Sequence, residues 1–220
     1  MLEKLKVQYL TSFCPYLIID NFYNEKELAA IWQELEFLCS DCKLESPTQY
    51  SSAIDEFTGE VLKNNKFIFI DDIYKDRKCS NILDVNRKLF NNWESIVQTH
   101  PDWYFNTLEC NKDCTLLSYY ENGGYYKPHK DKAHATSLTW LYKEPKMFTG
   151  GDLILSFNGE MERIEVKNNR MLIIPSFIDH EVIEVRMDNE DCGNHLGRFC
   201  ITQFCHFDTE FSKRINSHSE

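Results

Sequence analysis

The feature that most constrains the fold of this chain is a series of short apolar runs in its second half, rich in β-branched and aromatic residues. Residues typical of turns separate the runs at regular intervals. The runs cover residues 114–120, 136–142, 152–157, 161–166, 170–175, 181–186 and 198–207. Short strands at such spacing are typical of an all-β sandwich or barrel. We therefore expect a β core in the second half of the chain.

The first half of the chain shows a different pattern. Residues 15–22 (PYLIIDNF) form a short apolar run that predicts a strand. Asn24 follows as a helix N-cap, with Glu27 as its capping-box partner. Apolar residues then recur at helical spacing as far as Leu38. The chain is thus expected to open with a strand followed by a helix.

Three further segments lie between this helix and the β core. Residues 40–65 are polar and aperiodic, so we expect a long loop. Residues 66–70 (KFIFI) predict a strand, and residues 80–97 predict a second helix. These patterns indicate one structural unit of α+β class, mainly β with N-terminal helices. Its expected parts are a strand and helices in 1–102, a β core in 103–210 and a C-terminal tail in 211–220.

The composition favours a soluble protein that acts inside the cell. The chain has 220 residues and a formal net charge of −11, which argues against binding to nucleic acid or to anionic membranes. No stretch reaches the roughly 18 apolar residues that a membrane span needs. The N-terminal residues also lack the apolar run of a signal peptide. We expect a cytoplasmic location, with neither nucleic acid nor a membrane as partner.

Nine cysteines are present, and an odd number without an export signal indicates free thiols. Two pairs are closely spaced, Cys39 with Cys42 and Cys110 with Cys114. A four-cysteine zinc site is the alternative interpretation. Neither pair has a histidine at zinc-finger spacing, so we favour free thiols.

The sharpest local motif is His129-Lys130-Asp131. Side chains two residues apart in an extended segment point to the same face, so His129 and Asp131 can reach one metal ion together. His180 follows the predicted strand 170–175 and a turn, and it is the candidate third ligand. Two histidines and one carboxylate form the ligand set of non-haem Fe(II) oxygenases, which leaves coordination positions open.

Several motifs around these residues occur together in one known family. Residues 119–131 (YYENGGYYKPHKD) carry Tyr120, the pair Gly123-Gly124, Tyr126 and Pro128 ahead of His129. A second Gly-Gly pair follows at 150–151, then RMLIIPSFIDHEVIEV at 170–185 and GRFCITQFCHF at 197–207. In this order the motifs resemble prolyl-4-hydroxylase-like members of the 2-oxoglutarate/Fe(II)-dependent oxygenase superfamily. The opening strand and helix resemble the entry to the same fold more weakly.

The resemblance implies a double-stranded β-helix, which is a jelly-roll or cupin-like barrel. It also implies Fe(II), 2-oxoglutarate as co-substrate and O2, with ascorbate in a supporting role. His129, Asp131 and His180 would be the metal ligands and the catalytic residues. The strand pattern had indicated a barrel or sandwich independently of the resemblance.

Arg198 is the candidate partner for the distal carboxylate of 2-oxoglutarate. It begins an apolar strand, where an unpaired charge would be costly, and a guanidinium matches a carboxylate with two parallel hydrogen bonds. Arg186 is the rival candidate, although it lies close to His180. By resemblance, Tyr120 would bond the same co-substrate. The remaining candidates are Thr202 as an assisting group, and Tyr126 and Trp140 as pocket walls.

The other histidines have no partner pattern, and we expect them to be structural or solvated. They are His100, His134, His195, His206 and His218.

The expected activity is that of a 2-oxoglutarate- and Fe(II)-dependent dioxygenase that hydroxylates a prolyl residue in a protein or peptide. A free amino acid or another small molecule is the alternative substrate. From other classes, a cupin-like binding protein without turnover and a zinc-bound structural barrel stay open. Substrate would enter at the mouth of the barrel, with walls from the loops at 40–65 and 143–149.

Overall fold

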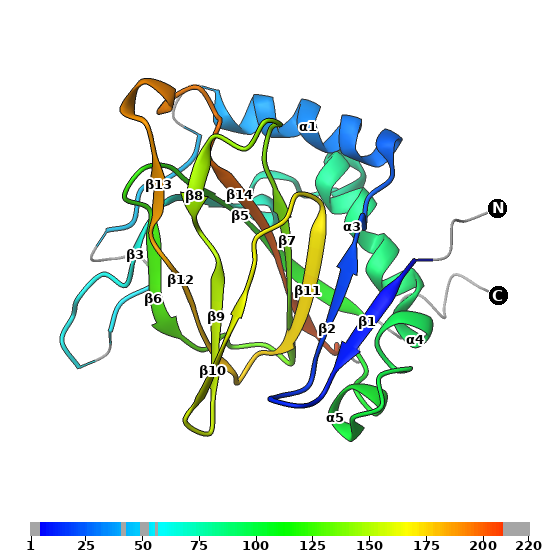
Figure 1. The fold of residues 1–220 in the computed structure, drawn as a ribbon. Coiled ribbons are helices and arrows are strands. Elements are labelled where there is room, and N and C mark those ends of the chain that lie inside the picture. Colours follow the sequence, from blue (N-terminus) through cyan, green and yellow to red (C-terminus); the bar gives the residue numbers. More distant parts are fainter. Residues whose placement is uncertain (1–4, 41–42, 49–52, 56, 209–220) are drawn as a thin grey trace.

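The computed structural model describes residues 5–40, 43–48, 53–55 and 57–208. Two antiparallel sheets face each other, and the helices cover the outer side of the larger sheet (Figure 1). The predicted α+β class, mainly β with N-terminal helices, is confirmed. Cys42 and the predicted tail at 211–220 lie outside the described residues.

The larger sheet has seven strands in the order β1-β2-β11-β7-β14-β5-β4. Every neighbouring pair in it is antiparallel. Its strands are β1 (Val7–Leu10), β2 (Tyr16–Asp20), β11 (Arg170–Pro175), β7 (Ala135–Leu141), β14 (Arg198–His206), β5 (Lys112–Tyr120) and β4 (Lys66–Phe69).

The smaller sheet has five strands in the order β10-β9-β12-β6-β3. Its strands are β10 (Glu160–Ile164), β9 (Leu153–Phe157), β12 (Asp179–Val182), β6 (Tyr125–His129) and β3 (Lys63–Asn64). A separate pair joins β8 (Phe148–Gly150) to β13 (Val185–Met187). Within the described chain the two large sheets share no strand, so the core is a jelly-roll sandwich and the expected barrel is not closed by hydrogen bonds.

The first predicted helix is confirmed as α1 (Glu25–Cys39), with the capping box between Asn24 and Glu27. The predicted helix at 80–97 is two helices, because the backbone leaves helical geometry at Asn92. The helices beyond α1 are α2 (Ile70–Ile73), α3 (Asn81–Asn91), α4 (Trp93–Ile96) and α5 (Trp103–Asn106), with single 3-10 turns at Arg77–Cys79 and Asn189–Asp191. No helix in the described ranges is long and apolar enough to cross a membrane.

Two sequence expectations differ from the structure in a way that shapes the site. The segment 40–65, expected to be a loop, contains strand β3, which pairs with β6. The run 181–186 is divided, because β12 pairs with β6 and β9 whereas β13 pairs with β8. Strands β1, β6 and β8 gave no apolar run in the sequence and were not predicted. The first difference adds β3 to the edge of the smaller sheet, and the second places β13 with β8 in a separate pair.

Strand β14 shows why the core strands read as nearly continuous apolar runs. Phe199, Ile201 and Cys205 point outward into the cluster formed with the helices. Cys200 points inward to the cluster between the sheets. A strand buried on both faces needs apolar residues at successive positions rather than at alternate ones. The inward positions of β14 are therefore the ones that can face a site between the sheets.

Glu34 of α1 is buried and ties this helix to the start of α3. Its carboxylate accepts hydrogen bonds from the Ser80 hydroxyl at 2.7 Å and from the Ile82 backbone N–H at 2.8 Å. Replacing Glu34 with alanine leaves two buried donors without an acceptor, so we expect a loss of about 1–3 kcal/mol in the free energy of unfolding. Urea denaturation measures this loss. The exposed Glu36→Ala is the matched control, and equal midpoints for the two variants would contradict the assigned role.

Candidate metal and co-substrate site

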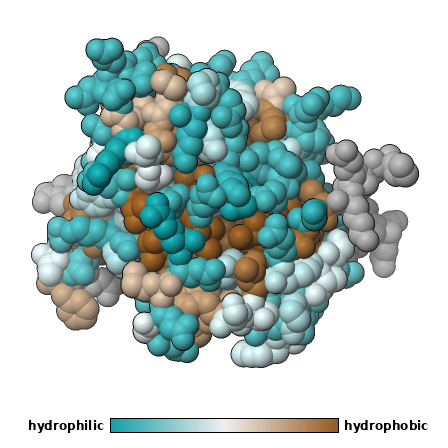
Figure 2. Space-filling view, in the orientation of Figure 1, coloured by the Kyte–Doolittle hydropathy of each residue, from teal (hydrophilic) through white to brown (hydrophobic). Residues whose placement is uncertain are grey.

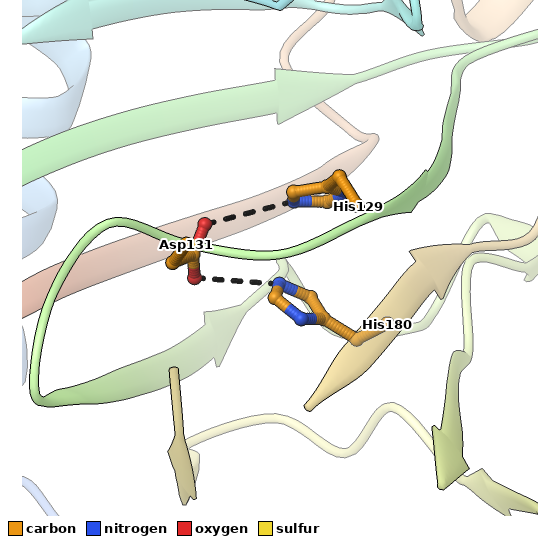
Figure 3. Close-up of side chains that lie close together, drawn as sticks. All are labelled: His129, Asp131 and His180. Carbon is orange, nitrogen blue, oxygen red and sulfur yellow. Dashed lines mark ion pairs between the residues drawn. The ribbon is translucent and has the colours of Figure 1, made fainter. Parts of the chain in front are cut away.

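Three side chains meet between the sheets near the end of β6. His129 is the last residue of β6, Asp131 follows two residues later, and His180 lies in β12 directly opposite His129 in the strand pairing (Figure 3). One Asp131 carboxylate oxygen lies 3.8 Å from Nε2 of His129, and the other lies 3.4 Å from Nε2 of His180. The potential ligand atoms of all three residues lie within 4.8 Å of one another.

These distances suit one metal ion. Ligands on adjacent corners of an octahedron, each about 2.1 Å from the metal, lie about 3 Å apart. Small inward movements of the three side chains would reach that separation. Among the described residues this is the one group of three or more histidine, cysteine or acidic side chains so arranged. Cys110 and Cys114, the fully described pair of the zinc alternative, are free thiols and belong to no such group.

The backbone fixes the orientation of both histidines. Nδ1 of His129 lies 2.9 Å from the Lys127 carbonyl oxygen, and Nδ1 of His180 lies 2.9 Å from the Ile178 carbonyl oxygen. Each Nδ1–H therefore donates to a carbonyl, which leaves the lone pair of Nε2 directed at the site.

Asp131 is held in the same manner. Its Oδ2 accepts a hydrogen bond from the Thr136 hydroxyl at 2.7 Å. Its backbone N–H donates to the Ser176 carbonyl at 3.0 Å, and Ser176 lies in the turn that leads to His180. The carboxylate is thus tied both to β7 and to the turn carrying the second histidine, which is the kind of outer support that metal ligands require.

The three groups influence one another electrostatically. Burial and the nearby His180 hold the pKa of His129 below its usual value. Burial also opposes the protonation of His180, but its hydrogen bond and attraction to Asp131 outweigh that effect and raise its pKa. The same contacts with His180 overcome the effect of burial on Asp131 and lower its pKa. These directions favour a protonated His180 beside an ionised Asp131, and a neutral His129.

This proton makes metal binding dependent on pH. A histidine must lose its proton to bind a metal. Because the pKa of His180 is raised, we expect Mn(II) affinity to fall about tenfold per unit as pH drops below that pKa. Calorimetry at pH 6.5 in two buffers of different ionisation enthalpy should show release of more than half a proton per metal ion bound. Binding without proton release would contradict a protonated His180.

A cavity of about 320 Å³ extends from these three residues along the inner faces of β14 and β5. Alternate residues of β14 line it, as the strand period requires: Arg198, Cys200, Thr202, Phe204 and His206. Tyr120, Ser118, Leu116 and Cys114 of β5 line it in the same way. The opposite wall includes Tyr126, Leu153 and Val182 of the smaller sheet. Figure 2 shows hydrophobic residues gathered at the centre of one face within a hydrophilic surround.

Arg198 is fully buried in this cavity, with 0% of its surface exposed. Its guanidinium lies 4.9 Å from the ring centre of Tyr120 and 5.7 Å from that of Trp140. None of its three nitrogens has a hydrogen-bond partner in the described part of the protein. The buried indole N–H of Trp140 also has no acceptor there. A buried charge without partners costs several kcal/mol, so this end of the cavity fits a ligand that brings an anionic acceptor.

The carboxylate of 2-oxoglutarate meets this requirement, since it accepts two parallel hydrogen bonds from a guanidinium. Burial raises the pKa of Tyr120 to about 12, so its hydroxyl keeps its proton and is a further donor on the cavity wall. Arg186, the rival candidate, has a 75% exposed side chain paired with Glu184 and lies outside the cavity. The structure therefore favours Arg198 over Arg186.

The remaining predicted residues divide into two groups. Thr202 lines the cavity, and Tyr126 lines it while stacking on His129 with ring centres 3.5 Å apart. Trp140 is fully buried behind Arg198 and does not line the cavity.

Among the other histidines, His100 is buried and bonded to the Tyr16 carbonyl, as a structural residue would be. His206 differs from expectation because it lines the cavity. His218 lies outside the described residues.

Sequence reasoning missed Lys63, Phe204 and His206 as cavity residues. The last two could have been found, since they share the face of Arg198 by the alternation along β14. Lys63 gave no signal, because its position depends on the pairing of β3 with β6.

Gly151 packs directly against Arg198 and has a positive φ of +74°. A Cβ at this position would lie 2.9 Å from Cδ of Arg198 and 3.0 Å from Cγ2 of Val185. We expect Gly151→Ala to displace the guanidinium and weaken 2-oxoglutarate binding about tenfold or more, while metal affinity stays unchanged. Titration of the metal-free protein with Mn(II) measures the metal affinity, and titration of the Mn(II) protein with 2-oxoglutarate measures the co-substrate affinity.

Gly159 supplies the control for this variant. It has a similar φ of +83°, but a Cβ there would meet nothing within 4 Å. Gly159→Ala therefore carries the same backbone strain without the contact, and equal co-substrate affinities in the two variants would refute the steric effect on Arg198.

Comparisons with known proteins agree with this geometry. Residues 114–206 match the family model described as the 2OG-Fe(II) oxygenase superfamily. None of the curated proteins compared with the chain matches it. A prolyl hydroxylase from Trichoplax adhaerens, solved with a peptide fragment of the hypoxia inducible factor oxygen degradation domain, is 15% identical, with a TM-score of 0.61 over 87% of this chain and 83% of that chain.

Two further solved structures share the fold. A prolyl-4-hydroxylase from Pseudomonas putida is 13% identical, with a TM-score of 0.60 over 88% of this chain and 92% of that chain. The structure of OsALKBH1 is 11% identical, with a TM-score of 0.58 over 90% of this chain and 100% of that chain. At such identities the likeness concerns the fold, which is the predicted double-stranded β-helix.

The matched segment contains His129, Asp131, His180 and Arg198, and it forms most of the cavity between the sheets. Fold, family match and the geometry of the three clustered side chains agree: residues 114–206 are similar to the 2OG-Fe(II) oxygenase superfamily, and the fold is like that of prolyl hydroxylases.

Proposed function

We propose that this chain is a 2-oxoglutarate/Fe(II)-dependent dioxygenase that hydroxylates a prolyl residue in a protein or peptide, with iron bound by His129, Asp131 and His180. The observation that carries the site assignment is the presence of this cluster and the unpartnered guanidinium of Arg198 in one cavity. Fe(II), 2-oxoglutarate and O2 belong to the family, and ascorbate would support turnover by keeping iron reduced.

The chain supplies binding and orientation. The three ligands would occupy one face of the metal and leave the other positions for co-substrate and O2. Arg198 would bind the distal carboxylate of 2-oxoglutarate, with Tyr120 and Thr202 on the adjoining wall. When bound, iron and 2-oxoglutarate supply the oxidation that inserts one oxygen atom of O2 into a substrate C–H bond and leaves succinate and CO2.

The substrate class rests on two supports. Two of the solved structures that share the fold are prolyl hydroxylases, and one of them holds a peptide. The other end of the cavity offers Phe69, Leu116 and Phe204, an apolar surface that suits a pyrrolidine ring. The net charge of −11 argues against nucleic acid as substrate and, with the free thiols, fits a cytoplasmic enzyme without a membrane partner.

Mass spectrometry of proline-containing peptides tests the substrate class. After incubation with Fe(II), ascorbate and 2-oxoglutarate under air, we expect a gain of one oxygen atom on a prolyl residue, and none with Asp131→Ala. Oxygen incorporation into another residue type or into a free amino acid would contradict the prolyl assignment while leaving the oxygenase intact. Failure to form succinate under any condition would contradict both.

A further inference from the structure

A second cation lies in the same cavity as Arg198. Lys63 of β3 lines the cavity and is only 6% exposed. Its ammonium lies 3.5 Å from the ring centre of Phe67 and 5.7 Å from that of Tyr126, which stacks on His129. It therefore belongs to the wall beside the metal ligands rather than to the outer surface.

Lys63 has no anionic partner among the residues that the structure describes. Its ammonium makes no ion pair or hydrogen bond within the described ranges. Its contacts there are cation–π contacts with the faces of the two aromatic rings. Burial lowers the pKa of Lys63 to about 8, so the ammonium form still predominates at neutral pH. A buried ammonium without an acceptor is costly, and the fold gives no reason to retain one.

The charges in the cavity are unlike those of the whole chain. The chain carries a net charge of −11, yet Asp131 is the one acidic residue among those lining the cavity. The lining cations are Lys63, Lys130, Lys132 and Arg198, of which Lys130 is paired with Asp179 at 3.4 Å. The cavity therefore attracts anions in an otherwise acidic protein.

Fe(II) and 2-oxoglutarate do not account for Lys63. The two positive charges of Fe(II) and that of Arg198 balance Asp131 and both carboxylates of the co-substrate. Lys63 is then left with an unbalanced charge. One carboxylate of 2-oxoglutarate is used by the metal and the other by Arg198, so the missing anion has to come from another ligand.

We propose that the substrate carries a carboxylate and that Lys63 binds it while Arg198 holds the co-substrate; this inference rests on the proposed function. Lys63 also lines a second hollow of about 240 Å³, together with Asn64, Asn65, Lys66 and Glu121, and Lys66 pairs with Glu121 at 3.8 Å. A carboxylate can therefore reach Lys63 from that side without displacing a group bound to Arg198. An acidic side chain, a peptide C-terminus and a free amino acid all supply this chemistry.

The test measures binding to the protein loaded with Mn(II) and saturating 2-oxoglutarate. One arm is a randomised octapeptide library with amidated C-termini, the second is the same library with free C-termini, and the third compares L-proline with L-prolinamide. A substrate with an acidic side chain predicts enrichment of peptides with Asp or Glu in the first arm. A peptide C-terminus predicts tighter binding of the library with free C-termini in the second arm, and a free amino acid predicts tighter binding of L-proline than of L-prolinamide in the third. Lys63→Gln should reduce that preference about tenfold or more, and Lys63→Arg should retain it.

Lys167→Gln is the matched control, because it removes one charge from an exposed lysine outside the cavity. It should leave the preference unchanged, and thermal unfolding of each variant reports correct folding.

Wild-type protein that binds 2-oxoglutarate but shows no preference for the acid in any arm overturns the proposal, as does a preference that survives Lys63→Gln. A loss of 2-oxoglutarate affinity in Lys63→Gln with the acid preference intact would assign Lys63 to the co-substrate and overturn it too. Wild-type protein that binds no 2-oxoglutarate would instead sink the proposed function.

Discussion

Replacing Arg198 with methionine is expected to weaken 2-oxoglutarate binding about 100-fold and, at the same time, to raise the thermal stability of the metal-free protein. The loss follows from two charge-assisted hydrogen bonds to the distal carboxylate, each contributing about 1.5–3 kcal/mol. The gain follows because a fully buried guanidinium without partners is replaced by an apolar side chain of similar length. About 1 kcal/mol corresponds to a shift of about 2–4 °C in a chain of this size.

Titration of the Mn(II) protein with 2-oxoglutarate and thermal unfolding of the metal-free protein measure the two effects. Arg198→Lys is the control, since it keeps the charge but loses the planar fork and should bind with intermediate affinity. A methionine variant with unchanged co-substrate affinity, or one that melts several degrees lower, would show that Arg198 is a structural residue.

Replacing Asp131 with alanine is expected to reduce Fe(II) affinity by at least about 100-fold and to remove turnover. Removing a residue that only hydrogen-bonds to a metal ligand lowers metal affinity about 10–100-fold. Asp131 is itself a proposed ligand, so its loss should lower the affinity more. His129→Ala should have the same consequence. Anaerobic titration with Fe(II), or with Mn(II) in air, provides the measurement.

His134 supplies the matched control for these variants. It is exposed, lies three residues beyond Asp131 and belongs to no metal-ligating cluster among the described residues. His134→Ala should bind iron like the wild type. Retention of metal binding by Asp131→Ala would mean that the ion sits elsewhere.

Local patterns were sufficient to predict most of the fold. Asn24 and Glu27 mark the start of α1 because the capping box depends only on neighbouring residues. The apolar runs of β5, β7, β11 and β14 are visible because these central strands are buried on both faces. Strand β6 is missed because all five of its residues are only partly buried or exposed, so its pattern is not apolar.

Such local patterns do not show which strands pair with each other. Nothing local in the run 181–186 indicates that its first residues pair with β6 and β9 and its last with β8. The end of α3 at Asn92 is likewise set by packing, since apolar residues continue at helical spacing into α4. The strand pattern left a sandwich and a barrel open, and the pairing of the strands settles this, since the two sheets of the described protein stay separate.

The sequence predicted those site residues that lie in one motif or on one strand. His129 and Asp131 are two residues apart, and Thr202 lies on the face of Arg198 in β14. Asp131 lies in the segment just after strand β6, where Thr136 and Ser176 hold it. Lys63 was not predicted, because it reaches the cavity only through the pairing of β3 with β6.

The most direct measurement of the site is the visible absorption of the anaerobic protein with Fe(II) and 2-oxoglutarate. A 2-oxo acid that chelates protein-bound Fe(II) gives a charge-transfer band absent from either component alone. We expect this band in the wild type, none in Asp131→Ala, and a band that needs about 100-fold more 2-oxoglutarate in Arg198→Met. Absence of the band in the wild type, or an undiminished band in Asp131→Ala, would contradict an iron site formed by His129, Asp131 and His180.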